Sequence, residues 1–239
     1  MAFWAARELL GFDFETTGVD RFHDVPVSYA LVTVIGGEVV RSSAGLIDPG
    51  RDIPSGATEI HGITTEQARS EGMSLKDAME MVADALLSAS RRGVPVAGMK
   101  LDYDLTMLET QTHRLCGAGL QQRGWTGPVL DAVVLDRHLD RFRKGSRTLS
   151  ALCEHYGVAI DHAHDAAADA TASIHVLLAL AARYRELRHT ELAYLHEAQV
   201  GWHQEWAKSY DEWRAGRGMP PIDPSDYEWP VAAEVRSAA

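Results

Sequence analysis

Three short β-rich segments open the chain. Residues 9–14 form an apolar run that enters the polar segment 15–18, which indicates a strand ending in a turn. Residues 25–35 and 39–47 are also β-rich and flank Gly36-Gly37, a pattern typical of a hairpin. The beginning of the chain is therefore predicted to be an antiparallel meander of three strands.

Helical periodicity follows. Residues 74–90 place apolar side chains on one stripe, with Ser74 as the expected N-cap. Further along, the pattern predicts a strand at 94–97, a helix at 102–115, a strand running into a helix at 128–134, and helices at 149–155 and 166–184. This order predicts an α/β fold with a mixed five-stranded sheet flanked by helices.

The pattern changes again from about residue 187. Trp202, Trp206 and Trp213 fall at helical spacing, which predicts one long amphipathic helix that stops at residues 216–218. An extended strap follows the stop. We therefore divide the chain into an α/β domain at 1–186 and a C-terminal extension at 187–239.

Composition narrows the function classes. The chain has 239 residues, of which 46% are apolar, and its formal net charge is −11. This acidity argues against a protein that binds nucleic acid through a broad basic surface, but not against an enzyme that contacts a few nucleotides at a metal site. Two cysteines and no long apolar run favour a cytoplasmic protein without disulfides or a membrane partner.

Acidic residues stand at three places that can meet in space. Asp13 and Glu15 are two apart on the first strand, so their side chains share one face, where two carboxylates are tolerated if water or a cation neutralises them. Asp104 falls in the first turn of a helix after a buried strand. Each feature alone also fits an ordinary surface or capping carboxylate.

The third place combines a histidine with another acid. His164 and Asp169 are five residues apart and cannot share one face of a regular helix, so His164 is expected in the loop before the helix, with Asp165 as the N-cap. Asp169 then points inward between alanines. Taken alone, His164 is more often a solvated loop residue.

Together, the three segments resemble the three motifs of the DEDDh, or DnaQ-like, exonuclease superfamily. The matching segments are residues 12–18, 103–105 and 164–169, and the resemblance covers about residues 8–185. It implies an RNase H-like fold and a 3′→5′ exonuclease similar to the proofreading epsilon subunits of bacterial replicative polymerases. The tail is similar to the tails of actinobacterial exonuclease-domain proteins.

The resemblance also assigns roles. It implies that two Mg²⁺ or Mn²⁺ ions are held by Asp13, Glu15, Asp104 and Asp169, and that His164 is the general base. Hard oxygen ligands suit these cations, and a neutral imidazole accepts a proton near pH 7.

The terminal nucleotide is expected to contact five further residues: Thr16, Thr17, His61, Ile63 and Lys100. Many relatives have His-Asn where this chain has Met99-Lys100. Lys100 could therefore face a carboxylate or a phosphate, or weaken the site.

The expected substrate is the 3′ end of single-stranded or mismatched DNA, with a polymerase or repair protein as a possible partner. An exoribonuclease that trims short RNA, as RNase T or oligoribonuclease does, is the alternative enzyme, and an inactive fold used as a binding module is the non-enzyme alternative. The sequence leaves the sugar preference, the partner and the oligomeric state open.

Two other patches remain ambiguous. A basic stretch at 137–147 could steer a phosphate backbone or form a solvated helix face. Trp202, Trp206 and Trp213 could stack on bases, although helical spacing favours core packing or an interface.

Overall fold

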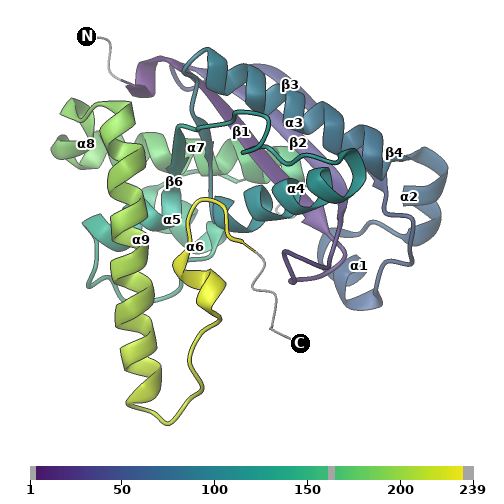
Figure 1. Cartoon of the computed structure of the whole chain (residues 1–239). Helices are drawn as coiled ribbons and strands as arrows, with labels where there is room; N and C mark the ends of the chain where they lie inside the picture. The colour runs from purple at the N-terminus through teal and green to yellow at the C-terminus, as the bar shows by residue number, and fades with distance from the viewer. Residues whose placement is uncertain (1–3, 161–164, 234–239) are drawn as a thin grey trace.

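A mixed six-stranded sheet runs through the protein in the order β4-β3-β2-β1-β5-β6 (Figure 1). The computed structural model describes residues 4–160 and 165–233. The strands are β1 (Glu8–Thr16), β2 (Pro26–Ile35), β3 (Glu38–Asp48), β4 (Met73–Ser74), β5 (Val96–Gly98) and β6 (Val129–Asp131). The first three form the predicted antiparallel meander, and the other pairings are parallel.

The predicted number of five strands was wrong by one. β4 is a two-residue edge strand that pairs Met73 with Ile47 and Ser74 with Asp48. Two residues cannot show an alternation of apolar and polar positions, so the sequence pattern could not reveal this strand.

Helices cover both faces of the sheet (Figure 1). They are α1 (Ser55–His61), α2 (Thr65–Glu71), α3 (Leu75–Arg91), α4 (Leu101–Cys116), α5 (Ala132–Leu139), α6 (Leu149–Tyr156), α7 (Ala166–Arg183), α8 (Arg185–His189) and α9 (Leu192–Ala215). Ser74 caps α3 as predicted, since its hydroxyl accepts a hydrogen bond from the Asp77 backbone N–H. The 3-10 turns η1 (Trp4–Ala6) and η2 (Pro224–Tyr227) complete the elements.

The alternation of β1 divides the core in two. Leu10, Phe12 and Phe14 face the apolar cluster formed with α3 and α4. Gly11 lies on the opposite face, where a Cβ atom would stand 2.9 Å from Ile174 Cδ1 of α7. Asp13 and Glu15 lie on the same face of β1 as Gly11, so their carboxylates face the N-terminal part of α7.

Helix α7 is 18 residues long and has a mean hydropathy of 1.2. By length and composition alone it could cross a membrane. Half of it is buried, against β1 and β2 among other elements. This is the position of a core helix.

The C-terminal extension packs on the edge of the sheet. The Gln199 side chain in α9 accepts a hydrogen bond from the Asp131 N–H at 2.8 Å and donates one to the Val129 carbonyl at 2.9 Å. Its amide thus pairs with the free edge of β6 as a further strand would. The predicted long amphipathic helix is confirmed, and Gly216 follows its last residue.

Candidate active site

Three carboxylates meet at the end of β1. Asp13 and Glu15 come from the strand, and Asp169 comes from the first turn of α7. Among the residues that the structure describes, these three form a group whose ligand atoms all lie within 4.8 Å of one another. The acids that the sequence placed on one strand face are therefore brought together with the predicted acid of the third motif.

Asp104 approaches from the other side of the strand. It lies in the first turn of α4, is 5% exposed, and accepts a hydrogen bond from the Phe14 N–H at 3.2 Å. Phe14 stands between Asp13 and Glu15 in the sequence, so this bond holds the Asp104 carboxylate close to both acids. Its charge acts on Asp13, and the charge of Glu15 acts on it in turn.

The electrostatics of the cluster favour a bound cation. Burial, and then the charges of Asp104, Glu15 and Asp169, raise the pKa of Asp13 well above its ordinary value. Burial and the charge of Asp169 raise the pKa of Glu15 to about 7. Four partly or fully buried carboxylates that destabilise one another fit a site for hard divalent cations, which would supply the missing positive charge.

The predicted general base, His164, lies outside the described residues, as does His162. The neighbouring Asp165 is described and caps α7, accepting hydrogen bonds from the N–H groups of Ala167 and Ala168 at 3.0 Å each. The sequence therefore identified the start of this helix correctly. The role of His164 remains a prediction.

The predicted nucleotide contacts divide into two groups. Thr16 is partly exposed and lines a cleft next to the carboxylates. Its hydroxyl donates to the Gly18 carbonyl at 2.7 Å, as does the Tyr103 hydroxyl at 2.5 Å. Thr17 is only 2% exposed, and its hydroxyl donates to Asp24 Oδ1 at 2.8 Å. The side chain of Thr17 therefore holds the loop after β1. Its backbone N–H also donates, to the Val25 carbonyl at 2.9 Å, so only the Thr17 carbonyl remains for a nucleotide contact.

His61 and Ile63 occupy the turn between α1 and α2. Ile63 is 9% exposed and packs with Val27, Ile53 and Ala68 in a small core cluster. The His61 imidazole accepts a hydrogen bond from the Ile63 N–H at 3.0 Å through Nδ1. Neither residue lines the cleft, and their predicted contact with a terminal nucleotide remains untested.

Lys100 caps α4 in a left-handed conformation, with φ 57° and ψ 39°. It is exposed and lines the cleft. The Asn that many relatives carry here tolerates this backbone region better than a lysine does, because its short polar side chain can bond locally. The lysine accordingly adds a positive charge beside the acids at some cost in backbone strain.

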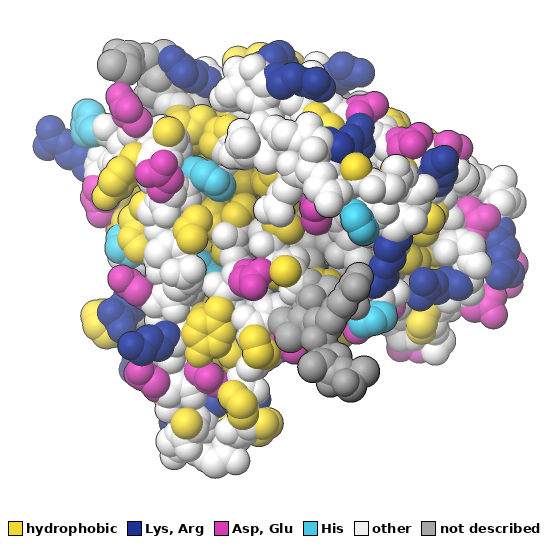
Figure 2. Space-filling view, viewed as in Figure 1, with side chains coloured by type: hydrophobic (Ala, Val, Ile, Leu, Met, Phe, Trp, Pro, Cys, Tyr) yellow, Lys and Arg dark blue, Asp and Glu magenta, His cyan; other side chains and the backbone are white. Residues whose placement is uncertain are grey.

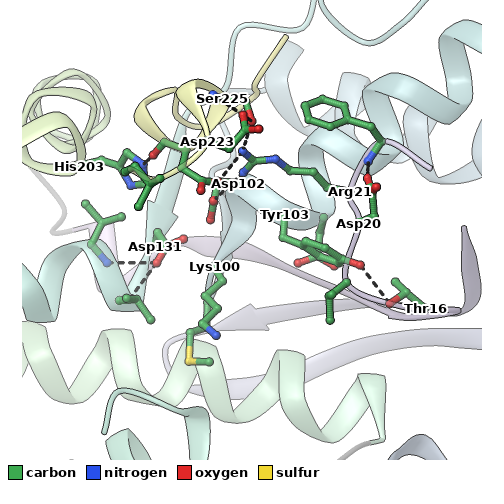
Figure 3. A pocket seen from close by; sticks show the side chains of 18 of the residues that line it. Thr16, Asp20, Arg21, Lys100, Asp102, Tyr103, Asp131, His203, Asp223 and Ser225 are labelled. Carbon is green, nitrogen blue, oxygen red and sulfur yellow. Dashed lines mark hydrogen bonds and ion pairs between the residues drawn. The ribbon is translucent and has the colours of Figure 1, made fainter. Parts of the chain in front are cut away.

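The cleft extends well beyond the carboxylates. It encloses about 1230 Å³ and reaches from Asp13 and Asp104 to His203, Trp206 and Tyr210 of α9. Figure 3 shows Arg21 between Asp102 and the strap near Ser225. Sequence analysis did not assign Arg21, His203 or Tyr210 to the site, because no local pattern places a C-terminal helix beside the second motif.

Arg21 fastens the extension to the domain. Its guanidinium donates to Asp102 at 3.3 Å, Ser225 at 2.7 Å and Asp226 at 2.8 Å, and the residue is 8% exposed. His203, 4% exposed, lies 2.9 Å through Nε2 from the Asp226 carbonyl, which accepts the imidazole proton. The loop after β1, α4 and the strap are thus tied at one point.

Two arginines of the basic stretch at 137–147 have a structural role. Asp136 is fully buried, and its Oδ2 accepts hydrogen bonds from Arg143 at 3.2 Å and Arg147 at 2.6 Å. Arg137 instead lies over the Trp206 ring, 3.4 Å from the centroid, and lines the cleft. The structure therefore favours the structural interpretation for Arg143 and Arg147 only.

Comparison with known proteins finds relatives of the α/β part of the chain. The exonuclease family model, RNase_T, matches residues 10–177. DNA polymerase III PolC-type of Latilactobacillus sakei is 30% identical over 181 residues, which are 73% of this chain and 11% of that protein. The PolC-type polymerase of Thermotoga maritima is 28% identical over 181 residues, 76% of this chain and 12% of the other. The chain thus spans about a tenth of the length of these relatives.

Solved structures show the same fold. Exonuclease I of Methylocaldum szegediense superimposes with a TM-score of 0.61 and 23% identity, covering 76% of this chain and 42% of that one. E. coli exonuclease I in complex with a dT13 oligonucleotide gives a TM-score of 0.64 and 20% identity, with 76% and 42% covered. The family match covers the carboxylate cluster and more than half of the sequence, and the chain belongs to the exonuclease family.

Proposed function

We propose that the protein is a divalent-metal-dependent 3′→5′ exonuclease that removes nucleotides from the 3′ ends of single-stranded or mismatched DNA. The observation that carries the proposal is the convergence of Asp13, Glu15 and Asp169 within 4.8 Å, beside the buried Asp104. This arrangement comes from three distant segments of the sequence, and four acids in one place are explained by a shared cationic ligand.

The side chains of the site have distinct tasks in this proposal. Asp13, Glu15, Asp104 and Asp169 would hold two Mg²⁺ or Mn²⁺ ions, which would supply positive charge at the scissile phosphate, the attacking water and the leaving 3′-oxygen. His164 accepts the proton of the water. Thr16 and the backbone carbonyl of Thr17 contact the terminal nucleotide, and Lys100 faces a phosphate.

The relatives support DNA as the substrate. PolC-type relatives are DNA polymerases by name, and the E. coli structural neighbour was solved with a DNA oligonucleotide. The net charge of −11 further argues against melting of a matched duplex, because the 34 acidic residues outnumber the 23 Lys and Arg residues that could help to offset about 1.4 kcal/mol per stacked step. A replicative polymerase or a repair protein is the partner that we propose.

Degradation of end-labelled oligonucleotides tests the proposal. With Mg²⁺ or Mn²⁺, 5′-labelled single-stranded DNA should shorten stepwise from its 3′ end, and EDTA should stop the reaction. Matched RNA in a parallel reaction tests the sugar preference. A 3′-phosphate should slow the reaction, and a mismatched end should be cut faster than a blunt matched one. Cleavage of circular single strands would contradict an exonuclease.

Two substitutions connect the reaction to the cluster. Asp13→Ala and Asp169→Ala should abolish turnover and weaken Mn²⁺ binding in calorimetry, while the fold persists. Glu59→Ala, which removes an exposed acid from α1, is the matched control and should leave both unchanged. Unchanged Mn²⁺ binding in both site variants would refute the metal assignment.

A further inference from the structure

Two side-chain hydroxyls meet beside the carboxylate cluster. Thr16 follows Glu15 at the end of β1. Tyr103 precedes Asp104 in the first turn of α4. The Thr16 Oγ1 and Tyr103 Oη atoms lie 3.2 Å apart, and both residues line the cleft (Figure 3). Each hydroxyl thus belongs to a residue next to a predicted metal ligand, although sequence analysis gave Tyr103 no role.

Both hydroxyls donate to one acceptor. The Gly18 carbonyl accepts hydrogen bonds from Tyr103 at 2.5 Å and from Thr16 at 2.7 Å. Both distances are shorter than the 3.2 Å between the two hydroxyl oxygens, so the protons are directed to the carbonyl, whose oxygen has two lone pairs. With their protons engaged in this way, the two hydroxyl oxygens face the cleft as hydrogen-bond acceptors.

The loop after β1 fixes the position of the Gly18 carbonyl. The Thr17 N–H donates to the Val25 carbonyl at 2.9 Å, and the Thr17 hydroxyl donates to Asp24 Oδ1 at 2.8 Å. A Cβ atom on Gly18 would overlap the Asp24 carboxylate, so glycine suits this close approach of the chain. The shared acceptor is therefore held in place, and it holds both hydroxyls in one orientation.

A pair of acceptors selects a ligand group that donates. The oxygens of an ionised phosphate accept hydrogen bonds, whereas a sugar hydroxyl can donate one. In a 3′→5′ exonuclease the scissile phosphate is joined to the 5′-oxygen of the terminal nucleoside. The free hydroxyl groups of that nucleoside would therefore lie about one sugar ring away from the carboxylate cluster, on the scale of the distance to Thr16 and Tyr103.

Contacts at the terminus matter because the rest of this surface offers little general affinity for nucleic acid. On the face drawn in Figure 2, the Lys and Arg side chains of the described residues are scattered among acidic ones. The aromatic rings along α9 stack on one another, and guanidinium groups lie over the first and the last of these rings. Recognition of an end thus depends on groups close to the acids.

We propose that Tyr103, together with Thr16, accepts a hydrogen bond from a hydroxyl group of the terminal sugar and so determines which ends are degraded fastest. The inference rests on the proposed nuclease function and adds to it a specificity-determining residue, Tyr103. The 3′-hydroxyl or the 2′-hydroxyl can supply the proton. A terminal 3′-phosphate, by contrast, brings further acceptors against two acceptors.

Kinetics on one oligonucleotide with three different ends test the proposal. The terminal nucleotide of dT12 carries a 3′-hydroxyl alone, a 2′-hydroxyl alone, or neither. Tyr103→Phe removes one acceptor and keeps the ring, while the Gly18 carbonyl retains its bond from Thr16. The variant should lose about 2- to 13-fold in kcat/KM on the end whose hydroxyl is bound, the effect of one hydrogen bond, and less than about 2-fold on the end without a hydroxyl.

The three ends also identify the hydroxyl that is bound, since the loss should appear on the 3′-hydroxyl end, the 2′-hydroxyl end or both. Tyr194→Phe makes the same change at an exposed tyrosine of α9 outside the cleft. This control should match the wild type on all three ends.

A second series uses the wild type alone and keeps the proposal testable if Tyr103→Phe does not fold. Fluorine in place of the bound hydroxyl removes the donor at similar size, whereas an amino group retains a donor. The wild type should degrade the amino end nearly as fast as the hydroxyl end and the fluoro end more slowly. Equal rates on the fluoro and hydroxyl ends would overturn the inference.

The outcomes separate this inference from the proposed function. If the wild type degrades none of the ends, the proposed function fails. If the ends are degraded but Tyr103→Phe loses the same factor on all three, Tyr103 only positions the loop after β1. If the variant loses on none of them, water occupies the acceptors. Either of these last two results overturns the inference while the nuclease function stands.

Discussion

The crowding of carboxylates makes a quantitative prediction about the metal-free protein. Glu15→Gln keeps the shape of the side chain and removes one charge from the cluster. Because burial and Asp169 raise the pKa of Glu15 from 4.5 to about 7, its ionised form destabilises the fold. We expect Glu15→Gln to raise the free energy of unfolding at pH 8 in the presence of EDTA.

The effect of the Glu15 charge on the free energy of unfolding depends on pH. Below about pH 4.5 Glu15 is protonated in both the folded and the unfolded chain, so the charge adds no penalty. Between 4.5 and about 7 the unfolded chain has released a proton that the folded chain retains, so wild-type stability falls as pH rises. Above about pH 7 Glu15 is ionised in both the folded and the unfolded chain, and its charge destabilises the fold to the full extent.

The magnitude follows from the same shift. A pKa raised from 4.5 to about 7 corresponds to about 3 kcal/mol at high pH. Glu15 is partly exposed, and screening by solvent reduces this value to roughly 1–2 kcal/mol. For a protein of this size, the midpoint of thermal unfolding should rise by roughly 2–8 °C.

Thermal unfolding between pH 4 and 8, with EDTA and with Mn²⁺, provides the assay. The gain of Glu15→Gln should appear only as pH rises, and Mn²⁺ should stabilise the wild type more than the variant. Glu59→Gln, on the exposed surface of α1, should follow the wild type. A variant no more stable than the wild type at pH 8, together with equal stabilisation of both by Mn²⁺, would refute the crowding argument.

Three other substitutions test the parts around the cluster. Arg21→Ala leaves the buried Ser225 hydroxyl and the partly exposed Asp226 without their donor, so it should cost roughly 1–3 kcal/mol in urea unfolding and expose the strap to proteolysis; an unchanged cleavage pattern would contradict that anchoring role. Lys100→Gly should stabilise the fold by about 1 kcal/mol because glycine accepts the left-handed φ of 57°, whereas Lys100→Ala should not; equal midpoints for both would dismiss backbone strain. His164→Ala should lower the rate by about 10²–10⁴ while Mn²⁺ binding survives, and His162→Ala should be mild; the reverse order would identify the other histidine as the base.

Much of the architecture follows from periodicity alone. The spacing of two on β1 placed Asp13 and Glu15 on one face, and Ser74 and Asp165 were identified as caps because their side chains can accept backbone N–H bonds. These features depend on residues close in sequence. The strand β4 was not predicted, because two residues are too few to show an alternation of apolar and polar positions.

The motifs identified which acids belong together, but the sequence by itself determined only their order along the chain. The tertiary structure decided their distances, since the close contact of α7 with Gly11 brings Asp169 to the strand, and the bond from Phe14 fixes Asp104. It also showed that the side chain of Thr17 is already bound within the loop.

The cleft beyond the acids was decided entirely by long-range packing. Helical spacing predicted that the tail is an amphipathic helix, yet the same spacing fits a core, an interface or a base-stacking surface. Long-range contacts place Trp206 beside the second motif, among them those of Gln199 with β6 and of Arg21 with the strap. The physical reason is that a local pattern fixes which face of a helix is apolar, whereas the partner of that face is chosen by the whole folded chain.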